Sequence, residues 1–245
     1  MCRMVGVVFR SEFPLGTLND LRHVAEVGAV PDEDERGHRD GWGIVSFMNG
    51  SPRYIGRSPR PMHLDPSFDS AIQDIGRLQT PNILIAHARA ASKGGATMEN
   101  AHPFVAGGTV LAHNGTVYSL RRTPEKLVPK GQSDSEVLAL LLAERCGETD
   151  DIERALTSLV VEDLDARDYS AAILLVSDGR TLLGYRDYRS EEKASYYDLQ
   201  LARCGGYVAL FQESLIGYSG DVSKVAKGEL VSVSTDLTVK RRMLA

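Results

Sequence analysis

The chain opens with MCRMVGVVF (residues 1–9), in which a cysteine at the second position precedes an apolar run. The segment Met4 to Phe9 predicts a short buried strand. If the initiator Met1 is removed, Cys2 carries a thiol and a free α-amine, with ordinary pKa values of roughly 8.5 and roughly 7.7–8.0. One residue then holds both a nucleophile and a base. The alternative is that Cys2 is simply the first residue of a buried strand, because free cysteine is among the most buried residue types.

The composition is that of an ordinary globular protein, with 42% hydrophobic and 25% charged residues in 245. A net charge of -5 gives no basic footprint for nucleic acid. We find neither an apolar run long enough for a membrane span nor a signal peptide. Three cysteines argue against a disulfide framework, so we expect a cytoplasmic location. The length, without linker or repeat, favours one domain.

The pattern of apolar residues predicts strands at both ends of the chain, with helices grouped between them. The expected strands are 4–9, 44–48, 53–56, 83–88, 107–112, 169–176, 181–185, 196–201, 207–211 and 229–239, and the expected helices are 17–28, 68–78, 133–142 and 151–161. Ser133 and Glu136 form a capping box, and Thr17 is a candidate cap of the first helix. This grouping is typical of a layered α+β fold.

Five short segments concentrate Gly, His, Asn, Asp and Arg, and they hold four of the six histidines. They are Cys2-Arg3, His38-Arg39-Asp40-Gly41-Trp42-Gly43, His87-Ala88-Arg89, Asn100-Ala101-His102-Pro103 with His113-Asn114-Gly115, and Ser133-Asp134-Ser135-Glu136. His-Arg-Asp also opens the catalytic loop of protein kinases, but the Asn that this loop requires is replaced here by Val45, which excludes a kinase.

In this order the five segments resemble the glutaminase domain of class II glutamine amidotransferases, which are N-terminal-nucleophile hydrolases. The run from His38 to Gly43 is similar to a small stand-alone branch that includes the γ-glutamyl hydrolase of ergothioneine biosynthesis. The motifs cover residues 2 to about 140. The resemblance implies an α+β fold, a four-layer αββα sandwich of two stacked antiparallel sheets, with residues 2–245 as a single domain of this type.

The resemblance also implies roles for individual residues. Cys2 would attack a γ-carboxamide and form a thioester, with its own α-amine moving protons. The side-chain amide of Asn114 and the backbone N–H of Gly115 would stabilise the oxyanion. Arg89, assisted by Ser92, would bind the α-carboxylate of the substrate, and Asp134 would accept from its α-ammonium group. Six further residues would shape the pocket: Arg36, Asp40, Trp42, Gly43, His87 and His102.

Each of these residues also has a structural alternative. Asn114-Gly115 is a common two-residue hairpin turn, which here would join residues 110–111 to 117–118. Arg89 is explained equally well as a surface residue at a strand end. Asp134 lies in the first turn of a capped helix, where a carboxylate is favourable in any case. Trp42 is more typical of a wall or core residue than of a catalyst.

A metal-dependent hydrolase is a further alternative. Its candidate ligands are His38, Asp40, His87, His102 and His113. None of them has the spacing of a helical metal motif, so we expect no metal and no other cofactor.

Two departures from the family pattern limit what the resemblance implies. Ala90 follows Arg89, where synthase-linked relatives often have Trp. Residues 210–213 replace a late Ala-Ser-Glu, so we assign no role to Glu213.

The sequence therefore predicts an amidohydrolase that cleaves the γ-amide of glutamine and releases ammonia to a separate acceptor or synthase subunit. Two alternatives are a hydrolase of γ-glutamyl conjugates, as in ergothioneine-type pathways, and a non-catalytic subunit that retains Met1. The expected partners are a glutamine or γ-glutamyl small molecule and a synthase subunit, without nucleic acid or membrane. A homo-oligomer is left open.

Overall fold

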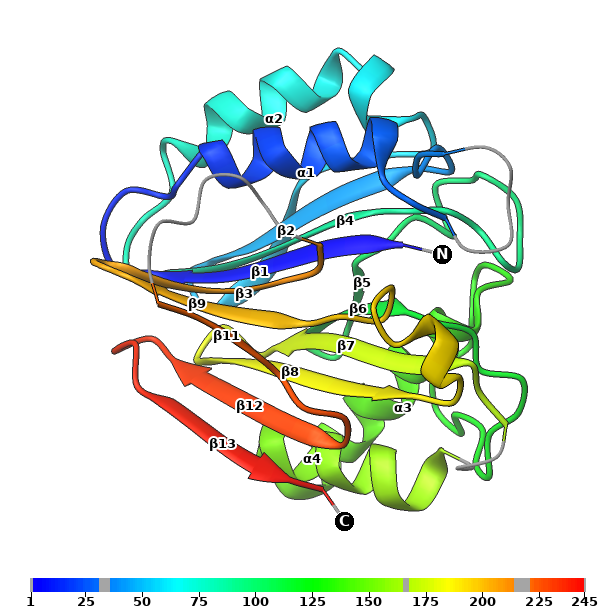
Figure 1. Ribbon diagram of the computed structural model, residues 1–245. Coiled ribbons are helices and arrows are strands. Elements are labelled where there is room, and N and C mark those ends of the chain that lie inside the picture. Colours follow the sequence, from blue (N-terminus) through cyan, green and yellow to red (C-terminus); the bar gives the residue numbers. More distant parts are fainter. Residues whose placement is uncertain (1, 31–35, 165–167, 214–220, 245) are drawn as a thin grey trace.

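The computed structural model describes residues 2–30, 36–164, 168–213 and 221–244. Two antiparallel sheets stack face to face, and helices cover the outer face of each sheet (Figure 1). The four layers follow the order αββα, which confirms the predicted α+β sandwich.

The first sheet has the opening strand of the chain in its middle. Its order is β11 (Asp221–Lys224), β9 (Gln200–Cys204), β10 (Tyr207–Phe211), β1 (Arg3–Phe9), β4 (Asn82–Ala88), β2 (Trp42–Met48) and β3 (Ser51–Ser58). Strand β1 pairs with β10 on one edge and with β4 on the other, so Val5 lies opposite both Phe211 and Ala86. Helices α1 (Gly16–Val27) and α2 (Ser67–Ile75) cover the outer face.

The second sheet is built from the middle and the end of the chain. Its order is β13 (Val239–Met243), β12 (Glu229–Ser234), β8 (Thr181–Tyr188), β7 (Ala171–Ser177), β6 (Thr109–Asn114) and β5 (Phe104–Ala106). Helices α3 (Asp134–Thr149) and α4 (Ile152–Ser158) cover its outer face, and a π-helical turn (Leu159–Asp163) follows α4.

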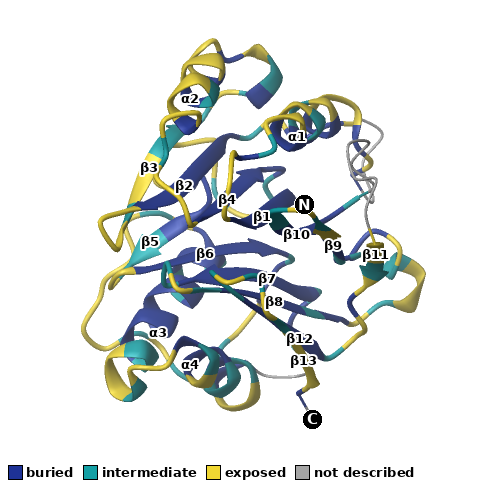
Figure 2. Cartoon of the chain, turned by 90° about the vertical axis from the view of Figure 1, so that its left-hand side faces the viewer, coloured by how far each residue is buried: buried dark blue, intermediate teal, exposed yellow. Residues whose placement is uncertain are grey.

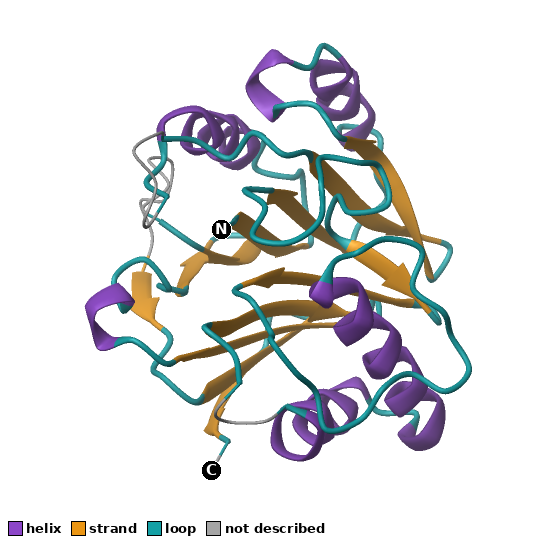
Figure 3. Cartoon of the chain, turned by 90° about the vertical axis from the view of Figure 1, so that its right-hand side faces the viewer, coloured by secondary structure: helices purple, strands orange, loops and turns teal. Residues whose placement is uncertain are grey.

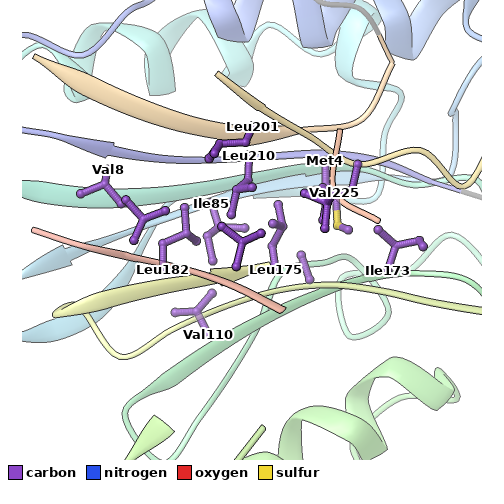
Figure 4. Close-up of a cluster of buried hydrophobic side chains, with 14 of the residues drawn as sticks. Met4, Val8, Ile85, Val110, Ile173, Leu175, Leu182, Leu201, Leu210 and Val225 are labelled. Carbon is purple, nitrogen blue, oxygen red and sulfur yellow. The ribbon is translucent and has the colours of Figure 1, made fainter. Parts of the chain in front are cut away.

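The period-two alternation of the strands divides the core into three clusters. Met4 and Val8 point between the sheets, where apolar side chains from both sheets interdigitate (Figure 4). Val5 and Val7 point outward against the helices. Figure 2 shows the result, with buried strands at the centre and exposed residues on the outer helical surfaces. Because Cys2 is two residues before Met4, the same alternation directs it toward the space between the sheets.

Gly6 lets the two sheets approach each other closely. A Cβ atom at this position would lie 2.9 Å from a side-chain carbon of Leu182 on the facing sheet.

Most expected elements are confirmed, with different ends. The hairpin of β2 and β3 turns at Asn49 and Gly50, whose φ values of 51° and 75° fit a tight two-residue loop. Helix α1 begins at Gly16 after Leu15, so Thr17 is not its cap. Other differences concern strands: 229–239 is two strands, β12 and β13, 196–199 lies outside β9, and β5 and β11 were not predicted.

The alternative of a hairpin turn at Asn114-Gly115 is wrong. Strand β6 runs through Asn114 and pairs with β5 and β7, whereas Val117 forms a bridge with Tyr169. The dipeptide therefore ends a strand instead of reversing the chain.

Candidate active site

The start of β1 lies at the end of the sandwich that is crossed by loops, beside the label N in Figure 3, and Cys2 directly precedes this strand. Cys2 is buried, and its backbone N–H donates to Oδ1 of Asn114 at 3.0 Å. Its Sγ lies 3.7 Å from the carbonyl oxygen of Ala90. The fold thus brings the first strand, the end of β6 and the segment after β4 to one point.

Asn114 and Gly115 are fixed at the end of β6. The Nδ2 group of Asn114 donates to Oε1 of Gln212 at 3.2 Å, so the buried amide is bonded on both sides. Gly115 has a φ of +146°, and a Cβ atom there would lie 1.9 Å from the carbonyl oxygen of Ala171. Only glycine fits this position.

Arg89 organises the loop that follows β4. Its buried guanidinium donates to the carbonyl oxygens of Gly95 at 2.9 Å and Lys93 at 2.6 Å. In the same loop, the hydroxyl of Ser92 is hydrogen-bonded to that of Thr116 at 2.7 Å. This loop is therefore joined to the segment directly after Asn114-Gly115, beside Cys2.

Asp134 is the first residue of α3, and Ser133 caps this helix as predicted. Oδ2 of Asp134 accepts from the backbone N–H of Val117 at 2.5 Å. Asp134 and Lys93 border a cavity of about 380 Å³. The second half of the expected capping box is wrong: the carboxylate of Glu136 accepts from the N–H groups of residues 130 and 131. It holds the loop before the helix instead.

The loop before β2 supports the segment that contains Arg89. Oδ2 of Asp40 accepts from the N–H of Ala91 at 2.7 Å, and its own N–H donates to the carbonyl of Arg89 at 2.8 Å. Gly43 is required by close packing, because a Cβ atom there would lie 2.5 Å from the carbonyl oxygen of His102.

Trp42 was expected to shape the pocket, but its side chain lies elsewhere. It packs in the cluster between the first sheet and its helices, edge-on to Phe68 and bonded to Asp65. The role of Arg36 stays a prediction: this residue is exposed, in a loop whose preceding residues 31–35 are outside the described part of the chain.

Three histidines, His87, His102 and His113, form a buried group at β4 and β6. The rings of His87 and His102 stack with centroids 4.3 Å apart, and Nε2 of His87 lies 3.3 Å from the carbonyl oxygen of His113. Burial lowers the pKa of His87 and of His102 well below the usual value, so both rings are neutral near pH 7. Within the described residues, no three His, Cys, Asp or Glu side chains are arranged to bind a metal ion.

Three contacts in the surroundings of Cys2 were missed at the level of sequence. The carbonyl of Ala90 lies against Cys2 itself, the amide of Gln212 accepts from Asn114, and Arg3 forms an ion pair with Glu213, in which Nε lies 2.5 Å from the carboxylate. Nη1 of Arg3 also donates to the carbonyl of Cys2 at 3.1 Å. Glu213, to which no role was assigned from the sequence, holds this arginine next to Cys2.

No helix in the described ranges is long and apolar enough to cross a membrane.

Comparison with known proteins identifies a family model, described as class-II glutamine amidotransferases, that matches residues 1–202. An uncharacterized protein of Methanocaldococcus jannaschii is 28% identical over 97% of this chain and 65% of its own length. Glutamine–fructose-6-phosphate aminotransferase of Xylella fastidiosa is 30% identical over 65% of this chain and 24% of its own. Human amidophosphoribosyltransferase is 30% identical over 58% of this chain and 28% of its own. The chain thus spans less than two thirds of the length of each.

Two solved structures share the fold. The glutamine phosphoribosylpyrophosphate amidotransferase of B. subtilis superimposes with a TM-score of 0.66 at 17% identity, over 100% of this chain and 49% of the other. A glutamine aminotransferase class-II domain protein of Silicibacter pomeroyi gives 0.61 at 18% identity, over 99% of both chains.

Proposed function

Since the chain belongs to the class-II glutamine amidotransferase family, we propose that it hydrolyses the γ-carboxamide of glutamine through a thioester on Cys2. The observation that carries this proposal is the 3.0 Å hydrogen bond between the Cys2 nitrogen and Asn114. A cysteine that is only the start of a strand does not require its nitrogen to be held by a buried side chain from the other sheet.

The chemistry needs Met1 to be removed, so that the Cys2 nitrogen becomes an amine. This amine takes the thiol proton, and the sulfur attacks the carboxamide carbon to form a tetrahedral intermediate. The C–N bond then breaks, and the α-ammonium group gives its proton to the leaving nitrogen. Ammonia departs, and a γ-glutamyl thioester remains on Cys2. A water molecule attacks the thioester, and glutamate and the free thiol are released.

The oxyanion of the intermediate requires fixed donors. We assign the backbone N–H of Gly115 and the amide of Asn114 to this task. One N–H of Asn114 Nδ2 is used by Gln212, and a primary amide has a second N–H to offer.

The glutamyl head is assigned to Arg89, Ser92 and Asp134. The Arg89 guanidinium donates to three carbonyl oxygens, those of Lys93, Gly94 and Gly95, which uses three of its five N–H donors and leaves two for a carboxylate. Asp134 borders a cavity at the start of α3, where its carboxylate can accept from an α-ammonium group.

We further propose that the ammonia passes to a separate synthase subunit, because in the longer relatives the matched part is only about a quarter of the protein. Residues 2–245 would then act as one glutaminase domain. The cytoplasmic location stays a prediction, as do the γ-glutamyl conjugate hydrolase and the non-catalytic subunit.

The proposal is tested by measuring glutamate and ammonia formed from glutamine. We expect turnover by the wild-type protein, a loss of at least about 10³-fold in Cys2→Ala, and wild-type rates in the matched control Cys204→Ala, whose thiol is on β9. Unchanged turnover in Cys2→Ala would refute the thioester.

A further inference from the structure

Tyr196 is a buried residue near Cys2 to which the proposed chemistry gives no task. It lies just before β9 and belongs to the core between the two sheets. Its side chain is only 9% exposed, and its hydroxyl makes no hydrogen bond of normal geometry within the described residues. Buried hydroxyls in folded proteins nearly always have a partner, so this one needs an explanation.

Arg3 connects Tyr196 to the nucleophile. The guanidinium of Arg3 lies over the tyrosine ring, 4.0 Å from its centroid, and also donates to the carbonyl of Cys2. The ion pair with Glu213 holds the guanidinium in this place. A cation is attracted to the face of an aromatic ring, and this attraction helps to hold the ring in place. The position of Tyr196 is thereby set relative to Cys2.

Tyr196 approaches Cys2 from the side opposite to the glutamyl-binding residues. Strands β4 and β10 flank β1 on its two edges. The loop with Arg89 follows β4, whereas Tyr196 and Glu213 belong to the segments next to β9 and β10. The carboxamide nitrogen of glutamine is at the opposite end of the molecule from the glutamyl head. When the head lies toward Arg89, the C–N bond that breaks therefore points away from Arg89. The leaving nitrogen therefore lies toward Tyr196.

We propose that Tyr196 forms the leaving-group side of the Cys2 site and that its hydroxyl hydrogen-bonds to the carboxamide nitrogen of the substrate. This inference rests on the proposed glutamine hydrolysis. The hydroxyl accepts from an N–H of the carboxamide and donates to the nitrogen lone pair that forms in the tetrahedral intermediate. The proton that leaves with ammonia still comes from the α-ammonium group of Cys2, and Tyr196 keeps its own.

The electrostatics of the position agree with a donor that does not ionise. Burial raises the pKa of Tyr196, and a thiolate at Cys2 adds to the increase, although Arg3 partly opposes it. The phenol is therefore neutral throughout the pH range in which the enzyme would work.

The residues on the leaving-group side of Cys2 also determine which class of substrate can react. Arg3, which donates to the Cys2 carbonyl and lies over the Tyr196 ring, and Gln212, which accepts from Asn114, are only 3% and 1% exposed. An enclosed wall admits a leaving group of the size of ammonia, and a bulky amine would collide with the ring. The site is thus specific for a primary γ-carboxamide over a γ-glutamyl conjugate.

The test compares glutamine with a γ-glutamyl arylamide in wild-type protein, Tyr196→Phe, Tyr196→Leu and a control, Tyr185→Phe. Tyr185 is a buried tyrosine of the second sheet that faces the helices, away from Cys2. Because Tyr196→Phe keeps the ring and removes a hydroxyl that has no hydrogen bond of normal geometry within the described residues, we expect its melting temperature to be unchanged or higher.

For glutamine we expect kcat to fall about tenfold or more in Tyr196→Phe with a smaller change in KM, since the bond strengthens in the transition state. In Tyr196→Leu the ratio of arylamide to glutamine turnover should rise about tenfold or more, and Tyr185→Phe should match the wild type. Wild-type kinetics on glutamine in Tyr196→Phe, or an unchanged ratio in Tyr196→Leu, would overturn the inference while the Cys2 chemistry stands. Absence of glutamine turnover in wild-type protein would instead remove the proposed function itself.

Discussion

Replacing Asn114 with Ala tests the geometry around Cys2 more fully than any other single change. The side chain is completely buried, and its two polar atoms bond to different partners, the Cys2 nitrogen at 3.0 Å and Oε1 of Gln212 at 3.2 Å. The change removes both bonds and leaves the Gln212 oxygen without this donor.

The expected loss of stability follows from these contacts. A buried hydrogen bond contributes about 0.5–1.5 kcal/mol, and an unsatisfied buried partner costs about 1–3 kcal/mol, which together suggest a loss of about 2–4 kcal/mol. In a chain of this size each kcal/mol lowers Tm by about 2–4 °C, so we expect a decrease of about 4–16 °C. Thermal melting and urea unfolding measure it. The loss of a donor to the oxyanion should also lower kcat about 10²–10³-fold.

Gln212→Met separates stability from catalysis. It removes the bond to Asn114 and the bond of Nε2 to the carbonyl of Asp198, which is 3.0 Å long, but keeps the contact between Asn114 and Cys2. We expect a similar loss of stability and a decrease in kcat of less than about tenfold. The reasoning fails if folded Asn114→Ala keeps kcat within about threefold of wild type, or if both variants lose the same activity.

Three further predictions concern other parts of the site. Arg89→Lys should raise KM for glutamine about tenfold or more with a smaller effect on kcat, because a lysine does not form a fork to a carboxylate; a change in kcat alone would contradict this assignment. Burial lowers the pKa of His102, so the histidine takes up its proton in the unfolded chain first as the pH falls below about 6.5. The free energy of unfolding therefore decreases in this range by up to about 1.4 kcal/mol per pH unit. Urea unfolding of His102→Phe between pH 5 and 7, about the ordinary histidine pKa, should show a slope smaller by about this amount, and an equal slope would be evidence against the neutral buried ring. Gly115→Ala should lower the free energy of unfolding, measured in urea, by more than about 3 kcal/mol. The control Gly108→Ala, at a position with a positive φ but open space around the Cβ, should lower it by only about 1–2 kcal/mol. Equal decreases would refute the clash with the carbonyl of Ala171.

The sequence was informative where local patterns decide the structure. The turn at Asn49-Gly50 and the cap at Ser133 both depend on a few neighbouring residues, and both are present. The continuous apolar run from Met4 to Phe9 similarly predicts a buried strand, and in the structure both of its faces are covered, as in the centre of a sheet.

Contacts between distant segments could not be derived in this way. Asn114-Gly115 has the local signature of a hairpin, and pairing with β7, more than 50 residues later in the chain, overrides it. Gln212 and Tyr196 carry no motif, because their importance comes only from strand order, which places β10 beside β1 and β9 beside β10. Trp42 was expected near the pocket from its neighbours in the sequence, but strand alternation turns it to the helical side.

The most direct test of the central claim is the mass of the mature protein before and after reaction with a glutamine-like electrophile, with the label mapped to a peptide. We predict that the protein lacks Met1 and takes up one label, on the N-terminal residue Cys2, in competition with glutamine. A chain that retains Met1 and still hydrolyses glutamine, or a label on Cys146 or Cys204 in place of Cys2, would contradict the account.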